Sequence, residues 1–434
     1  MSRAVTALLG MLWMSLAHSQ TAPLERELNA VFADPAMPLA SLAVLAVRAG
    51  QVHYSFQAGQ RQVGAVASPV TDQTLFRIAS ISKMVTTMGL LKLVEQGQLD
   101  LDADIGRYLG YTVRNPYFPE RVISLRMLLS HRSSLRDGAG YYWSGETAIR
   151  TELTRGAAAM WSATQAPGSY FSYANLNWGV VGTIMEQVSG ERFDRLMQRL
   201  LLQPMGLPGG YYPASFSSAE LAQLATLYRK RTTETEVWDP QGPWIAQVDA
   251  LQRQGPSAAA IPANYVPGSN GTLFSPTGGL RISAHGLGQL MLMLIQQGQY
   301  QGQTILQPAS IALMFSQQWC FDGSNGDTEN GQYGSWGLGS QRFGMLADGR
   351  DRLVEDQDFH GVGHLGEAYG LLSTFAVDLQ RGDGMIVLIG GVGRDPALHP
   401  GRYSALTRSE ERLLTALYRQ IRQPAPQAKA AQEH

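Results

Sequence analysis

Strand-like segments near both ends of the chain constrain its fold more than any other feature. Residues 41–47 are apolar and strand-favouring, and residues 51–57 alternate between apolar and polar after a turn at Ala49-Gly50. Residues 371–377 and 385–389 form a second pair of strand-like runs, joined by a glycine-containing turn. Two hairpins so far apart in the chain bury their apolar faces together in one antiparallel sheet built from both termini.

The long middle of the chain has the residue spacing of helices. Apolar residues recur every three to four positions from Ile81 to Val94, and Gly97 is suited to end that helix. Similar patterns predict further helices over residues 24–32, 124–130, 176–204, 217–230, 284–297 and 413–421. The expected fold class is α/β (α+β), with the antiparallel sheet flanked by helices and an inserted, mostly helical domain.

This organisation predicts a division into domains. Residues 20–88 and 275–423 would form a discontinuous α/β domain, and residues 89–274 would form the helical domain. Residues 424–434 have the composition of a disordered tail. A cleft between two such lobes is a usual place for a ligand site.

The first 19 residues have the parts of a secretory signal peptide. Arg3 provides a positive charge, residues 4–16 are apolar, and Ala17-His18-Ser19 matches a small-residue cleavage site. The apolar run has 13 residues, whereas a helix that spans a bilayer needs about 20. We therefore expect cleavage near Ser19, no transmembrane anchor, and a periplasmic or secreted protein.

Charge and cysteine content exclude some kinds of function. The formal net charge of −1 gives no basic surface for nucleic acid. Cys320 is the only cysteine, so no intrachain disulfide can form, and we interpret it as a small buried hydrophobic residue. Lysine is rare, because only four of the 34 basic residues are lysines: Lys83, Lys92, Lys230 and Lys429.

One of these lysines stands three residues after a serine at the start of the helix over residues 81–94. Residues three apart share a helix face, so the side chains of Ser80 and Lys83 can meet. A serine hydroxyl needs a base to become a nucleophile, and a lysine shielded from water can be that base, whereas arginine cannot. The N–H of a residue that opens a helix can also bind an oxyanion. The alternative is an exposed pair on a surface helix.

A tyrosine and an asparagine form the second candidate motif, Tyr173-Ala174-Asn175. Tyr173 can serve as a general base if nearby cations stabilise its phenolate. The amide of Asn175 can hold a substrate group or Lys83. A core tyrosine beside a turn asparagine is the alternative interpretation.

The third candidate motif is His364-Leu365-Gly366, which precedes the strand over residues 371–377. Gly366 allows a backbone to approach a ligand closely. The N–H of Glu367 could complete an oxyanion pair with that of Ser80. His364 has two open interpretations, a substrate-binding residue and a structural one.

Other candidate sites in the sequence are weaker. Residues 361–366 match G-x-G-x-x-G, but a hairpin is expected after them where nucleotide binding needs a helix. His360 and His364 have the spacing of zinc ligands, which makes a metallohydrolase a rival, yet the glycines among them argue against a helix. No Gly-x-Ser-x-Gly segment occurs, which argues against an α/β-hydrolase. We expect no cofactor and no metal.

The order Ser-x-x-Lys, Tyr-x-Asn, His-x-Gly resembles that of the class C β-lactamase and penicillin-binding serine hydrolase superfamily. The similarity covers about residues 24 to 422, nearly all of the mature chain. Further segments resemble landmarks of that superfamily: Phe76-Arg77-Ile78-Ala79, Leu128-Leu129-Ser130-His131 with Ser133-Ser134-Leu135, and Gly278-Gly279-Leu280 followed by Ser283.

The resemblance implies a β-lactamase/transpeptidase-like fold and an acyl-enzyme on Ser80. It implies that Lys83 and Tyr173 handle the proton, and which of them is the base stays open. The expected substrate is a small-molecule ester, amide or peptide. The residues Tyr141-Tyr142-Trp143 either line an aromatic substrate pocket or pack the two lobes together.

The third motif departs from the Lys-Thr-Gly usual among β-lactamases of this superfamily. Leu365 cannot hydrogen-bond a substrate carboxylate, and Glu367 would repel it. The sequence therefore predicts an esterase or a D-peptide or amide hydrolase. The alternatives are a β-lactamase or DD-carboxypeptidase, and a non-catalytic protein of the same fold that binds peptidoglycan or another partner.

Overall fold

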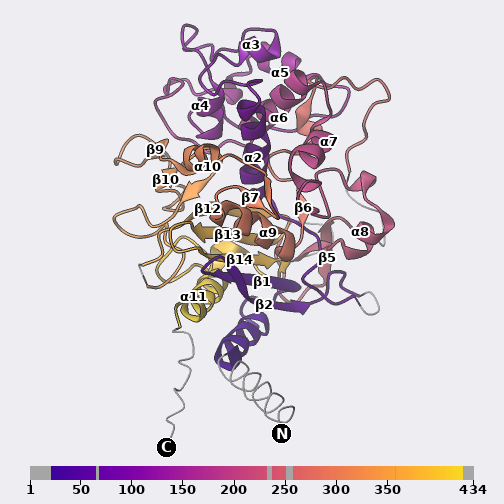
Figure 1. The fold of residues 1–434 in the computed structure, drawn as a ribbon, viewed down its shortest axis with the longest axis vertical. Helices are drawn as coiled ribbons and strands as arrows, with labels where there is room; N and C mark the ends of the chain where they lie inside the picture. Colours follow the sequence, from indigo (N-terminus) through magenta and orange to yellow (C-terminus); the bar gives the residue numbers. More distant parts are fainter. Residues whose placement is uncertain (1–20, 65–67, 232–236, 251–257, 357, 424–434) are drawn as a thin grey trace, which may run out of the picture.

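The computed structural model describes residues 21–64, 68–231, 237–250, 258–356 and 358–423. These residues form a broad sheet with helices on both of its faces and a helical part above it (Figure 1). The predicted signal peptide at 1–19 and the predicted tail at 424–434 lie outside the described residues. Within the described residues, no helix is both long enough and apolar enough to cross a membrane.

Strands from both ends of the chain form the central sheet, as the two hairpins predict. Its eight strands run in the order β2-β1-β14-β13-β12-β11-β10-β9. The N-terminal hairpin joins the C-terminal one where β1 pairs antiparallel with β14, with Val44 opposite Val387. The strands are β1 (Ser41–Arg48), β2 (Gln51–Gly59), β9 (Trp319–Cys320), β10 (Ser335–Trp336), β11 (Gln341–Arg342), β12 (Val362–Ala368), β13 (Leu371–Asp378) and β14 (Asp383–Ile389).

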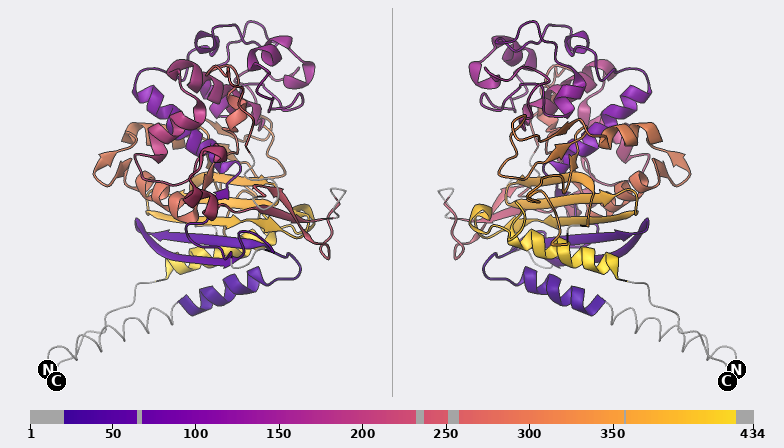
Figure 2. Two further views of the ribbon diagram at one scale, coloured as in Figure 1. Left: turned by 90° about the vertical axis from the view of Figure 1, so that its right-hand side faces the viewer. Right: turned by 90° about the vertical axis from the view of Figure 1, so that its left-hand side faces the viewer.

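Two hydrophobic cores lie on the two faces of this sheet. Successive side chains of a strand point to opposite faces, so Leu45 joins one core and Val44 the other. Helix α9 (Ala284–Ile295) packs on the first face. Helix α11 (Arg408–Arg422) and the helix at residues 21–32 cover the second, below the sheet in both views of Figure 2.

The helical part stands on the first face of the sheet, at the top of Figure 1. Two long helices dominate it, α2 (Ile81–Glu95) and α6 (Leu176–Ser189), and both are buried over most of their length. Shorter helices surround them: α3 (Gly106–Leu109), α4 (Leu125–Leu129), α5 (Ile149–Arg155), α7 (Phe193–Met197) and α10 (Pro308–Phe315). Helix α2 continues through the predicted domain boundary at residue 88, and that division stays a prediction.

The helix predicted over residues 217–230 is wrong in its second half. Helix α8 (Ser218–Gln223) begins with a capping box and ends early, and strand β4 (Leu227–Lys230) follows it. Strand β4 pairs antiparallel with β5 (Trp244–Val248) and parallel with β15 (Gly391–Val392). This pairing buries Leu227 and Tyr228, so tertiary contacts override the local helical spacing.

Candidate active site

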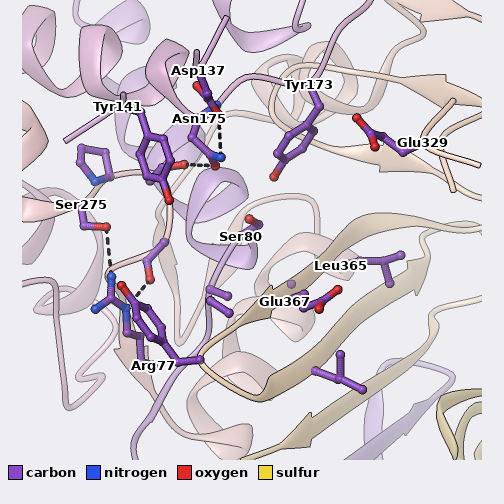
Figure 3. Close-up of a pocket in the computed structure, with 18 of the residues that line it drawn as sticks. Arg77, Ser80, Asp137, Tyr141, Tyr173, Asn175, Ser275, Glu329, Leu365 and Glu367 are labelled. Carbon is purple, nitrogen blue, oxygen red and sulfur yellow. Dashed lines mark hydrogen bonds between the residues drawn. The ribbon is translucent and has the colours of Figure 1, made fainter. Parts of the chain in front are cut away.

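A cleft of about 1100 Å³ opens between the β12 side of the sheet and the helical part. Ser80, Tyr173 and Asn175 line it, together with Leu365 and Glu367 of strand β12 (Figure 3). Gly366 of the same strand also lines it. The structure therefore brings the three sequence motifs to one cavity, although they lie almost 300 residues apart in the chain. His364 is not among the described residues that line the cleft.

Ser80 occupies the residue position before helix α2. It serves as the N-cap, and its hydroxyl makes no capping hydrogen bond, which leaves the oxygen directed into the cleft. Ala79 has a φ of 48°, so the backbone turns sharply just before the serine. The N–H of Ser80 has no hydrogen-bond acceptor in the described part of the chain, as expected for a helix start.

Lys83 lies one turn into α2 and is fully buried. Its Nζ atom is 2.9 Å from Ser80 Oγ, 2.9 Å from Asn175 Oδ1 and 3.0 Å from the carbonyl oxygen of Thr277. Burial lowers the pKa of the amine from 10.5 to about 7, although the charge of Asp137 acts in the opposite direction.

These three contacts match the hydrogen-bonding capacity of a neutral amine. Asn175 Oδ1 and the Thr277 carbonyl can only accept, so they take the two hydrogens of an NH₂ group. The nitrogen lone pair then faces the hydroxyl of Ser80. The site can therefore hold Lys83 uncharged and ready to accept the serine proton.

A carboxylate that the sequence analysis missed orients Asn175. The Asp137 carboxylate accepts hydrogen bonds from the side-chain amide of Asn175 at 2.9 Å and from the backbone N–H groups of Asn175 and Leu176. Thr277, also missed, donates to Asn175 Oδ1 at 2.8 Å. Both residues are therefore second partners of the asparagine that holds Lys83. Neither residue belongs to one of the three motifs. Thr277 directly precedes the landmark Gly278-Gly279-Leu280, which is the one sequence signal that could have indicated it.

Tyr173 points from the opposite wall towards Ser80 (Figure 3). Burial raises the pKa of the phenol, and a hydrogen bond with the Ser80 side chain lowers it in part. The Nζ atom of Lys83 lies 4.9 Å from the centre of the Tyr173 ring. Tyr173 is therefore a protonated phenol at neutral pH, able to donate a hydrogen bond to the serine oxygen or to a group that replaces its proton.

Strand β12 presents a backbone N–H beside Ser80. It is joined to β13 by a tight turn at Tyr369-Gly370, whose φ angles are 58° and 85°, as a type I′ hairpin requires. The pair closing such a turn, Ala368 and Leu371, is hydrogen-bonded, and bonding alternates along the ladder. The N–H of Glu367 therefore points away from β13, towards the open edge of β12.

Gly366 allows this edge to lie against the start of α2. A Cβ atom at this position would lie 2.8 Å from the carbonyl oxygen of Ile78 and 3.1 Å from the nitrogen of Ser80. No larger residue fits without displacing backbone. The N–H groups of Ser80 and Glu367 are thus adjacent donors, suited to a negatively charged oxygen.

His364 lies behind the wall of the cleft, on the face of β12 shared with Gly366. It is 1% exposed, and its Nδ1 atom contacts the carbonyl oxygen of Leu365. Burial, and then the neighbouring Lys83, lower its pKa to about 3, so the imidazole is neutral. Of the two interpretations in the sequence analysis, this placement favours the structural one.

The aromatic segment predicted at residues 141–143 divides between its two proposed roles. Tyr141 and Tyr142 line the cleft and are 43% and 52% exposed. Trp143 packs against the larger hydrophobic core. Arg77 lines the same side of the cleft and lies 4.8 Å from the ring centre of Tyr369.

The other candidate sites are not formed as ligand sites. Residues 361–366 lie in or next to strand β12, and a second strand follows, so no helix N-terminus is available for a dinucleotide. Within the described residues, no group of three or more His, Cys, Asp or Glu side chains is arranged to hold a metal ion. Cys320 is half-buried in β9 and is not among the described residues that line the cleft.

Several known proteins are similar to this chain in sequence and in fold. The family model described as Beta-lactamase matches residues 30–407. Esterase EstB of Burkholderia gladioli is 29% identical over 277 residues, which cover 58% of this chain and 67% of the esterase. The D-alanyl-D-alanine-carboxypeptidase/endopeptidase AmpH of Escherichia coli strain K12 is 27% identical over 162 residues, which cover 36% of this chain and 41% of that protein.

The solved structures agree on the fold. The octameric penicillin-binding protein homologue from Pyrococcus abyssi superposes with a TM-score of 0.62 at 21% identity, over 87% of this chain and 75% of the other. The family match spans most of the chain and includes all three motifs of the cleft. The chain belongs to the Beta-lactamase family and is a serine hydrolase with the penicillin-binding protein fold.

Proposed function

We propose that this protein hydrolyses small esters or D-amino-acid amides and peptides through an acyl-enzyme on Ser80. The observation that carries the proposal is the contact of 2.9 Å between Ser80 Oγ and the buried Lys83 Nζ atom. The two hydrogens of the neutral amine are accepted by Asn175 Oδ1 and the Thr277 carbonyl oxygen. Ser80 Oγ would attack the substrate carbonyl while its proton passes to Lys83 Nζ. The Tyr173 phenol, beside both groups, would relay that proton to the leaving group.

The same residues would serve the second half of the reaction. The N–H groups of Ser80 and Glu367 would stabilise the oxyanion of each tetrahedral intermediate. A water molecule would then attack the acyl-enzyme, give its proton to the Lys83–Tyr173 pair, and release Ser80 with its proton restored. We assign the base to Lys83, because its pKa lies near neutrality while burial raises that of Tyr173.

The cleft favours neutral or amine-bearing substrates over anionic ones near the serine. Leu365 offers no hydrogen bond, and the carboxylates of Glu329 and Glu367 line the cleft. Burial raises the pKa of Glu367, and the positive charge of Arg229 lowers it in part. The likeness to esterase EstB supports an ester substrate, and the likeness to AmpH supports the alternative, a D-alanyl peptide.

We also propose that the protein acts outside the cytoplasm after removal of residues 1–19. The proposal rests on the charge, apolar run and cleavage pattern of that segment. N-terminal sequencing of protein recovered from an extracytoplasmic fraction would test it.

Labelling of Ser80 decides between an enzyme and a non-catalytic binding protein. We expect a fluorophosphonate probe to label the wild-type protein and to leave Ser80→Ala unlabelled, because the variant lacks the nucleophile. A Ser130→Ala variant, which changes a serine outside the cleft, should label like wild type. Mass spectrometry of the labelled peptide checks the position. Unlabelled wild type, or equal labelling of Ser80→Ala, would contradict the proposal.

Replacement of Lys83 by arginine tests whether a removable proton is required. Lys83→Arg keeps a cation but cannot act as a base, so p-nitrophenyl ester turnover should fall by about 100- to 10,000-fold. Lys92→Arg, at a lysine of the same helix that pairs with Glu95, should stay within about twofold of wild type. Near-normal activity of Lys83→Arg would rule out Lys83 as the base.

The pH dependence of kcat/KM should report the same group. Because the neutral amine is the active form, activity should be low below its pKa, rise through about pH 7, and reach a plateau above it. Initial rates on a neutral ester between pH 5 and 9 measure this rise of kcat/KM with pH. A rate that is flat across that range, with chemistry rate-limiting, would show that the ionisation of Lys83 does not control catalysis.

Glu367 tests the charge preference of the cleft. Glu367→Gln keeps the backbone N–H and removes the charge, so kcat/KM for an ester that carries a carboxylate should rise by about 3- to 10-fold. The value for a neutral ester of the same size should stay within about twofold. Glu120→Gln, at an exposed position outside the cleft, is the matched control. An equal change for both esters would exclude a selective effect of charge.

A further inference from the structure

His131 is a buried residue of the helical part that the proposed reaction does not use. It follows helix α4, is 1% exposed, and has a φ of 55°, which a residue with a side chain rarely adopts. It ends the segment Leu128-Leu129-Ser130-His131, which resembles a landmark of the superfamily. An unusual backbone angle at a buried polar residue shows that the surrounding structure holds it in place.

The hydrogen bonds of His131 lie on both sides of Tyr173. Its carbonyl oxygen accepts the N–H of Ser172 at 2.9 Å, and its Nδ1 atom accepts the N–H of Ala174 at 3.0 Å. The tyrosine thus stands between two backbone groups that are bonded to one histidine. Because Nδ1 accepts, the imidazole is neutral and carries its hydrogen on Nε2.

The ring of His131 also supports the phenol directly. The two rings are stacked, with their centres 4.3 Å apart and an angle of 23° between their planes. The rings of Trp178 and Trp336 enclose the imidazole at centre distances of 4.9 and 5.0 Å. Tyr173 therefore rests on a side chain that is itself immobilised by packing.

The burial of this imidazole has a cost that packing alone does not explain. Its Nε2 atom has no hydrogen-bond partner in the described part of the chain, and a buried unpaired donor destabilises the folded state. A ring without polar atoms would fill the same space without this cost. Such a ring could not accept the hydrogen bond from the Ala174 N–H, nor the contact of the Asn177 side-chain amide nitrogen, which lies 3.3 Å from the same Nδ1 atom.

We propose that His131 is a positioning residue that fixes Tyr173 over Ser80 through the Ala174 N–H···Nδ1 hydrogen bond. The inference rests on the proposed function, since it assigns the proton relay to Tyr173. A displacement of about 1 Å at a catalytic group can cost about 100-fold in rate. The loss should therefore appear in kcat, because His131 does not line the cleft that holds the substrate.

Two substitutions separate the hydrogen bond from the packing. His131→Asn keeps an acceptor, since Oδ1 is bonded to Cγ as Nδ1 is, and asparagine tolerates a positive φ. His131→Phe keeps a buried ring and removes the acceptor. Ser130→Ala is the matched control, because it changes the neighbouring residue, whose hydroxyl donates to the carbonyl oxygen of Arg126.

The test is a comparison of kcat and KM on one p-nitrophenyl ester, with folding checked by circular dichroism. We expect kcat of His131→Phe to fall by about 10- to 100-fold with KM within about twofold, and kcat of His131→Asn to stay within about threefold of wild type. Ser130→Ala should match wild type. If His131→Phe does not fold, His131→Ala replaces it, with the same expected loss of kcat. The kcat of folded His131→Asn then still tests whether an acceptor at this position is enough to keep activity.

Three results would overturn the inference: wild-type kcat in His131→Phe, a loss in folded His131→Asn as large as in His131→Phe, or a change confined to KM or to stability. Wild type and Ser80→Ala are measured in parallel. If wild type turns over the ester and Ser80→Ala does not, such a result refutes the positioning role alone. If wild type is inactive, the proposed function fails and the inference fails with it.

Discussion

The contact between the buried Lys83 amine and the Ser80 hydroxyl is the interaction on which the rest of the site depends. A lysine with no exposure to solvent is stable in the folded protein only if it is neutral or if each of its hydrogens has an acceptor. Here Asn175 and the Thr277 carbonyl supply two acceptors, and Ser80 takes the third position. The same geometry therefore stabilises the buried amine and prepares it for catalysis. The acceptors that satisfy its hydrogens also turn its lone pair towards the Ser80 hydroxyl.

The fold explains how residues so distant in sequence can meet this requirement. Ser80 is the N-cap of helix α2 and Lys83 lies in its first turn, so their spacing needs only one turn of helix. The remaining contacts come from α6, from the loop at Thr277 and from β12, which reaches the site because the C-terminal hairpin joins the N-terminal one in a single sheet. Gly366 is where that sheet touches the start of α2, and only a residue without a side chain permits the approach.

The parts of the site that could be predicted are those determined by local spacing. Period-two and helical patterns predicted β1, β13, β14, α2 and α11, and the helical spacing predicted that the side chains of Ser80 and Lys83 can meet. Asp137 and Thr277 could not be predicted in this way, because their partner Asn175 is 38 and 102 residues away along the chain. Only the landmark Gly278-Gly279-Leu280, which directly follows Thr277, marks one of the two positions. The same reason explains the wrong helix at residues 217–230, where pairing with β15, over 160 residues later, determines the structure of Tyr228 and Arg229.

A common electrostatic property links the groups around the nucleophile. His131 and His364 have lowered pKa values because of burial, and Lys83 lowers both further, so a charge on any one of the three raises the cost of a charge on the others. Around Ser80 the protein therefore disfavours the charged forms of Lys83, His131 and His364. In such surroundings a new negative charge on a substrate oxygen interacts strongly with the few groups aimed at it, the N–H groups of Ser80 and Glu367. Arginine, which this chain otherwise prefers, would introduce a permanent charge at the centre of this region, and this is the physical reason why one of its four lysines stands there.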